Sequence, residues 1–121
     1  MGQESWGNTR EPITRDRVAI QGTTISASTN ETTIVTATSG FYNDICSIVI
    51  SNTSAATATR IDFRDATNGT VLFSINSPGN SVVGFAPTVP IPQTTKNANW
   101  TAQCSGSVTD IRILVQYFKS S

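Results

Sequence analysis

From Val18 onward the chain consists of short runs in which apolar and polar side chains alternate, separated by turn residues. Alternation with a period of two is typical of half-buried strands, and no segment keeps the 3.6-residue apolar period of a helix. Eight such runs spaced about ten residues apart predict an all-β fold, an antiparallel β-sandwich of the jelly-roll type. The predicted strands cover residues 18–26, 31–39, 44–53, 57–65, 70–76, 81–86, 99–105 and 109–119.

The stretch IDFRDATNGTVLFSI, residues 61–75, predicts a β-hairpin. A two-residue loop would turn the apolar face of one strand toward the polar face of the other. A three-residue loop over 67–69 instead pairs Phe63 with Phe73, and it needs a last residue with a left-handed backbone, which Gly69 supplies. Turn chemistry and face pattern therefore agree on this register.

The last predicted strand has two unlike faces. Its inward side is apolar, while its outward side mixes polar residues with Leu114 and Phe118. Large apolar side chains on an outward face suggest cover by another part of the chain or by a partner, so both residues are candidate interface residues. The inward positions of all strands predict a core that includes Ile48, Phe63, Phe73, Ile75, Trp100 and Ile113.

Residues 86–97 carry three prolines and cannot form a central strand, because proline has no N–H for the ladder. We expect this segment to cross over the sandwich in an extended conformation. Val89 and Ile91 are its expected points of attachment.

Residues 1–17 read as an extended polar arm, followed by one sandwich domain over 18–121. The arm has no apolar period, and it carries a single tryptophan, Trp6. This side chain is either idle or an anchor that docks on another chain, since aromatic residues are common interface anchors. The charged residues expected to pair with a neighbour beside it are Arg15, Asp16 and Arg17.

Composition narrows the range of partners. Eight basic and eight acidic residues give a formal net charge of zero, which argues against a partner that is a nucleic acid or an anionic membrane. Serine and threonine make up about a quarter of the chain and suit the exposed faces of strands. The N-terminus has no apolar signal-like region, so we expect the chain to be made and folded in a cytoplasm.

The two cysteines, Cys46 and Cys104, share strand parity with inward residues. We expect two buried free thiols that act as small apolar side chains. The alternative is a disulfide between facing sheets, because their spacing resembles that of immunoglobulin domains. A zinc site is not expected, because the chain has only two cysteines and no histidine and a structural zinc ion needs four ligands.

No residue pattern indicates catalysis, a cofactor or a metal. The chain has no histidine, which excludes Ser-His-Asp and Cys-His arrangements. Paired carboxylates would have to come from aspartates that we expect to be solvated at turns and outward positions, namely Asp44, Asp62, Asp65 and Asp110. Trp100 is expected to anchor the core, with a sugar-stacking platform as the alternative.

Two blocks of the chain resemble small β-rich virion proteins of tailed bacteriophages. They are YNDICSIVISNTSAATATRIDFRDATNGTVLFSI and GFAPTVPIPQTTKNANWTAQCSGSVTDIRILVQYFK, and they lie within residues 42–119, a range that is about two-thirds of the chain. Within them, VPIPQ at 89–93 has a proline where the family pattern has a lysine, and residues 1–17 match nothing in that pattern.

This resemblance implies a non-enzymatic virion component without a catalytic residue. The first expectation is a head decoration or cementing protein that is located in the virion after assembly in the host bacterial cytoplasm. It would be a homo-oligomer or present in many copies on the particle, with the major capsid protein as its partner. The alternatives are a tail, neck or fibre-associated component and, from another class, a carbohydrate-binding β-sandwich. An exposed aromatic pair beside aspartate and asparagine would favour carbohydrate binding.

Overall fold

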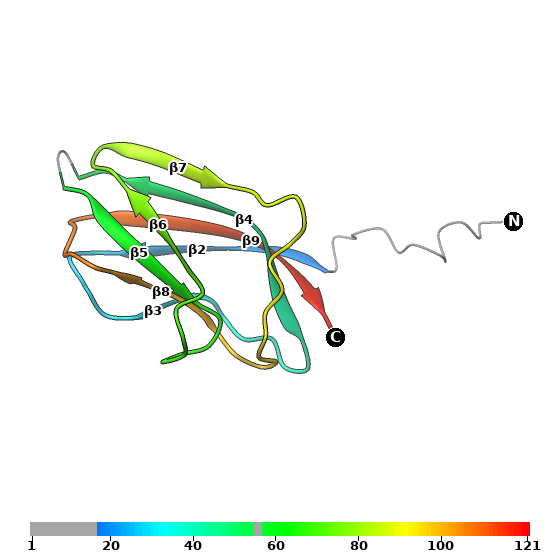
Figure 1. Cartoon of the computed structure of the whole chain (residues 1–121). Coiled ribbons are helices and arrows are strands. Elements are labelled where there is room, and N and C mark those ends of the chain that lie inside the picture. Colours follow the sequence, from blue (N-terminus) through cyan, green and yellow to red (C-terminus); the bar gives the residue numbers. More distant parts are fainter. Residues whose placement is uncertain (1–16, 55–56) are drawn as a thin grey trace, which may run out of the picture.

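The computed structural model describes residues 17–54 and 57–121, and within these ranges it contains eight β-strands and no helix (Figure 1). All eight predicted strands are present, with ends that shift by a few residues. The strands are β2 (Val18–Ile25), β3 (Thr32–Val35), β4 (Tyr42–Asn52), β5 (Thr59–Arg64), β6 (Phe73–Ser77), β7 (Ser81–Phe85), β8 (Trp100–Cys104) and β9 (Ile111–Ser120).

The strands form two antiparallel four-stranded sheets packed face to face. One sheet has the order β2-β9-β4-β7, and the other has the order β3-β8-β5-β6. The first strand pairs with the last, β3 pairs with β8, β4 with β7, and β5 with β6, as in one long hairpin rolled over itself. This pairing is that of a jelly roll, so the predicted fold class is confirmed.

The core lies between the two sheets and consists of the inward positions of the alternating strands. Trp100 is fully buried there, and its indole N–H donates a hydrogen bond to the backbone carbonyl of Asn43. Of the residues expected in the core, Phe73 and Ile75 are half-buried and pack against its margin. The others are fully or almost fully buried: Ile48, Phe63, Trp100 and Ile113.

The hairpin between β5 and β6 has the predicted register, with Phe63 opposite Phe73 and their rings stacked at a centroid distance of 4.8 Å. The predicted tight loop is wrong, because the ladder ends at this pair and the chain opens into a longer loop. The left-handed residue is Asn68, with φ of 61°, rather than Gly69. Asparagine tolerates this conformation, and the Glu31 carboxylate accepts its N–H.

A β-bulge interrupts the pairing of β4 with β9. Ile45 faces Tyr117 and Ser47 faces Gln116, so Cys46 is an extra residue without an opposite partner. The bulge reverses the inward and outward parity of the strand from this point toward its start. The prediction that Cys46 is buried is therefore wrong, since its side chain is half-buried.

The proline-containing crossover is attached mainly by a glutamine that the prediction overlooked. Ile91 forms an isolated bridge with Ile45, as expected of an attachment point, but Val89 is largely exposed and does not hold the segment. Gln93 is buried, and its side-chain oxygen accepts the backbone N–H of Asn43 at 2.7 Å. Its side-chain nitrogen donates to the carbonyls of Asp65 and Ala98, at 3.0 and 2.8 Å.

Asp65 is not solvated as predicted. Its side chain is buried, and one carboxylate oxygen accepts hydrogen bonds from both the backbone N–H and the hydroxyl of Thr94. The carboxylate thus binds the residue next to Gln93, so the end of β5 and the crossover are joined at two adjacent points.

Candidate interaction surface

The outer face of the sheet β2-β9-β4-β7 carries a row of small and apolar residues across all four strands. Gly22 on β2 lies opposite Leu114 on β9, which lies opposite Val49 on β4, which in turn lies opposite Gly84 on β7. Leu114 is 44 % exposed, and Val49 is exposed beside it. Two more exposed aliphatic side chains extend this face at its edge strands, Ile20 on β2 and Val82 on β7. We call these four apolar residues and two glycines the outer apolar face.

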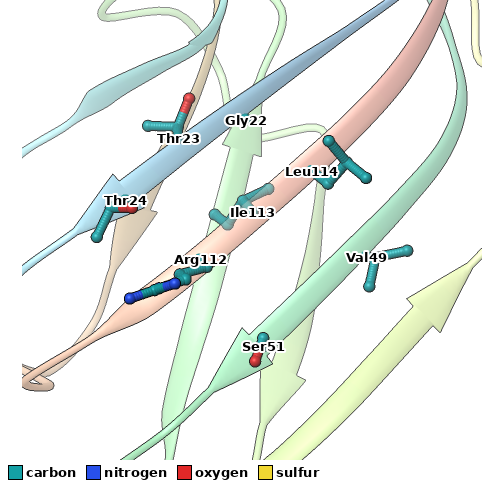
Figure 2. A pocket seen from close by; sticks show the side chains of 8 residues that line it. All are labelled: Gly22, Thr23, Thr24, Val49, Ser51, Arg112, Ile113 and Leu114. Carbon is teal, nitrogen blue, oxygen red and sulfur yellow. The ribbon is translucent and has the colours of Figure 1, made fainter.

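Because the two glycines have no side chain, the surface is lower on either side of Leu114 and Val49. An open hollow of about 230 Å³ lies where Gly22 has no side chain, and the Cδ1 atom of Leu114 lies 3.9 Å from the position that a Cβ of Gly22 would occupy. Figure 2 shows Leu114 and Val49 on neighbouring strands, with Gly22 on the far side of Leu114 and Arg112 and Ser51 in the next row. This face therefore combines a ridge with a hollow.

Charge is sparse on this surface. In the row next to the glycines, Thr24 lies opposite Arg112, which lies opposite Ser51. The Arg112 guanidinium lies 3.4 Å from the carboxylate of Asp110 on the preceding loop. A partner that covers the apolar row would therefore desolvate few charges, which suits a protein partner better than a polyanion.

The structure separates the predicted interface residues into three groups. Leu114 lies at the centre of the outer apolar face, while Phe118, four residues further along the same side of β9, is half-buried. Arg17 is exposed at the start of β2, and its carbonyl accepts the N–H of Lys119 at 2.8 Å. The remaining predicted interface residues lie outside the described residues: Trp6, Arg15 and Asp16.

A polar hollow of about 340 Å³ lies on the other sheet. Arg64 donates to the side-chain oxygen of Gln103 at 2.7 Å and to the carbonyl of Gly69 at 2.9 Å, so its lining groups largely satisfy one another. No aromatic residue lines it. Trp100 is fully buried and therefore anchors the core, so the aromatic pair that would favour carbohydrate binding is not found at this hollow.

Both cysteines are free thiols. Partial burial, reinforced by the negative charge of Asp44, raises the pKa of the Cys46 thiol. Burial also raises the pKa of the Cys104 thiol, although a hydrogen bond with Thr59 acts in the opposite direction. Because the thiolate is the reactive form, both groups are less reactive near neutral pH than an ordinary cysteine.

Neither a cluster of potential metal ligands nor a membrane-spanning helix is found in the described ranges. Residues 17–54 and 57–121 contain no group of three side chains suited to hold a metal ion. In the same part of the chain there is no apolar helix of membrane-spanning length.

The surroundings of Asp62 on β5 lower the pKa of its carboxyl group. Its carboxylate accepts hydrogen bonds from the Arg60 guanidinium at 2.9 Å and the Ser74 hydroxyl at 2.6 Å, and these bonds lower its pKa. A lowered pKa in the folded state stabilises the protein above the ordinary pKa of aspartate, and this contribution is lost as the pH falls through the folded-state value.

We therefore expect Asp62→Asn to lower the urea midpoint slightly and by a constant amount above about pH 5, and this difference should shrink below about pH 4. The effect is small because the Arg60 side chain is 56 % exposed and solvent screens its charge, although the Asp62 side chain is only 16 % exposed. Urea unfolding of both proteins over a pH series measures it. A difference that persists unchanged at the acidic end of the series would contradict this assignment.

Comparison with known proteins supports the fold. No protein-family model matches the chain, and no curated protein sequence matches it. A similar solved structure is described as "Bacillus endospore appendages form a novel family of disulfide-linked pili". The match covers 87 % of this chain and 90 % of the other, with a TM-score of 0.50 and 13 % sequence identity. At that identity the likeness shows a shared all-β sandwich and nothing more.

Proposed function

We propose that the chain is a non-enzymatic structural protein that attaches to other proteins through the outer apolar face. The observation that carries this proposal is the exposed row of Leu114 and Val49 between two glycines, with little charge around it. Exposed apolar surface of this kind marks interaction sites in soluble proteins. Its low charge favours a protein partner over a nucleic acid.

Within this role, we propose a virion component, and first of all a head decoration protein that binds the major capsid protein. The resemblance of residues 42–119 to small bacteriophage virion proteins supports this choice, and so does the jelly roll, an architecture common among viral capsid domains. Tail, neck and fibre-associated components share these features, so copy number distinguishes them from a decoration protein.

The test is quantitative mass spectrometry of purified particles that contain the chain. A copy number in the hundreds supports decoration of the head, and a small fixed number indicates a tail or neck position. Absence of the chain from particles, together with its presence free in the cell, would overturn the virion role.

Leu114→Lys is expected to weaken attachment of the added chain to particles that lack it by roughly tenfold or more, because a charge then has to be desolvated at the centre of the contact. Co-sedimentation of chain and particles measures this change. Leu72→Lys is the matched control, since both leucines are 44 % exposed and Leu72 lies away from the outer apolar face. Equal binding by the two variants would place the contact elsewhere.

A second candidate is a subunit of a filament. The similar solved structure is described in terms of disulfide-linked pili, and this chain has a free, half-buried thiol at Cys46 in the bulge of β4. Electrophoresis of native assemblies with and without reductant distinguishes this candidate. Covalent ladders that collapse on reduction would favour a filament over a decorated head.

A further inference from the structure

Within residues 17–54 and 57–121, strand β2 is the long free edge of its sheet. It spans Val18–Ile25, contains neither charge nor proline, and pairs with β9 on one side only in an unbroken register. The other edge strands are shorter: β3 has four residues and an irregular ladder, and β6 and β7 have five residues each. Natural proteins protect long edges with charges, prolines or bulges, and the described part of β2 has none of these.

The backbone direction along β2 follows from one hydrogen bond. The N–H of Lys119 donates to the carbonyl of Arg17, and these two residues are directly opposite in the register. In an antiparallel ladder, hydrogen-bonded pairs alternate with non-bonded pairs, so the odd residues of β2 bond to β9. The even residues therefore direct their N–H and C=O groups toward the free edge: Val18, Ile20, Gly22 and Thr24.

We propose that this edge pairs with β2 of a second copy of the chain, antiparallel and about a two-fold axis at Gln21. In that register Val18 pairs with Thr24 of the second copy and Ile20 pairs with Gly22. All four N–H and all four C=O groups of each edge are then paired, and no other two-fold register along β2 uses all of them.

The side chains fit the same register. Ile20 is 67 % exposed, and it lies as far from the axis on one side as Gly22 lies on the other. Each Ile20 would thus stand beside the partner's hollow, next to the Leu114 side chain that leans over the glycine. A two-fold contact requires one patch to carry both the projecting group and its recess, and β2 does so within three residues.

This pairing deepens the proposed structural role and rests on it. Pairing of two edge strands buries less surface than the about 800 Å² per partner of a standard stable interface. We therefore expect a weak dimer that dissociates at low micromolar concentration. Such a contact gains strength when many copies lie side by side in one assembly.

The first experiment measures the mass of the full chain by analytical ultracentrifugation from low micromolar to near-millimolar concentration. We expect the mass to rise from 12.9 kDa toward twice that value. Ile20→Lys should weaken the dimer at least about tenfold, because the lysine would lie on the paired edge. Val89→Lys is the matched control, being 72 % exposed on the crossover after β7 and outside the outer apolar face, and should leave the dimer unchanged.

The second experiment tests the register in a Cys46→Ser background. Residue 21 faces its own copy as a non-hydrogen-bonded pair about 4.5 Å apart, so Gln21→Cys should form an intermolecular disulfide on mild oxidation. Thr23→Cys is the control, because the two copies of residue 23 would be about 13 Å apart and out of bonding range. Thermal unfolding of each variant verifies that the fold is retained.

A chain that stays monomeric over the whole range overturns the proposal. A dimer that Ile20→Lys does not weaken, or that crosslinks through residue 23 rather than 21, also overturns it. The measurement uses the isolated chain, whereas the structural role is tested on particles. Either result can therefore fail without the other.

Discussion

Replacing Trp100 with alanine is expected to lower the free energy of unfolding by about 4–6 kcal/mol. The indole is fully buried between the sheets, its ring centre lies 6.5 Å from that of Phe73, and its N–H is the partner of the Asn43 carbonyl. The substitution removes the largest buried side chain and leaves that carbonyl without this donor. The total free energy of unfolding of such domains is about 5–15 kcal/mol, so the variant should be largely unfolded, or close to unfolding, at 37 °C.

Urea unfolding followed by far-ultraviolet circular dichroism measures the loss, since tryptophan fluorescence is itself altered. Trp100→Phe is the control, because it keeps most of the packing and removes only the N–H, at a cost of about 1–3 kcal/mol. A loss below about 2 kcal/mol for the alanine variant would contradict this prediction. It would mean that the two sheets move together and fill the cavity, whereas such substitutions usually cost about 3–5 kcal/mol.

Gln93→Ala is expected to destabilise the protein by about 3–5 kcal/mol, although it removes only a polar side chain. Three backbone groups from separate segments lose their partner at once: the N–H of Asn43 and the carbonyls of Asp65 and Ala98. The side chain is only 4 % exposed, so water replaces it poorly at this position. Differential scanning calorimetry should show a correspondingly lower melting temperature.

The matched control is Gln116→Ala, since Gln116 is exposed on the outer face of β9 and makes one weak contact with the Ser47 hydroxyl. We expect it to change stability by less than about 0.5 kcal/mol. If the two glutamine variants melted alike, the crossover would be held by its apolar contacts and not by the Gln93 side chain.

The sequence predicts the strands well because the signal for each strand, the alternation of apolar and polar residues, lies within the strand itself. The alternation in β9 and the paired aromatics of the β5–β6 hairpin repeat every two residues, and the sheet uses the same period. The jelly-roll class follows from strand number and spacing. The order of strands within each sheet does not follow from local pattern, because it depends on which distant edges meet.

Prediction from the local pattern fails where a single residue interrupts the two-residue alternation of a strand. A single extra residue at Cys46 reverses the parity of the first half of β4, and nothing in the residue types announces it. The left-handed position at Asn68 depends on the Glu31 carboxylate, which lies 37 residues away in the chain. A rule for short loops therefore selects the neighbouring glycine.

The candidate surface also could be predicted from the sequence only in part. Leu114 is found from its own strand, because it is an apolar residue in an outward position. Ile20, Val49 and Val82 join it on one face only after the order β2-β9-β4-β7 is known. Buried polar side chains such as Gln93 are harder still to find, since their partners come from three segments and glutamine is usually exposed.

The rolled pairing also sets when the protein can fold during its synthesis. β9 lies between β2 and β4 in its sheet, yet it follows the other seven described strands in the chain and is made after them. At about 5–20 residues per second, β2 and β4 wait several seconds on the ribosome for the strand that joins them. Their sheet can close only after β9 has been synthesised. Loss of residues 111–120, which form β9, would therefore divide the sheet into two unconnected parts rather than shorten its edge.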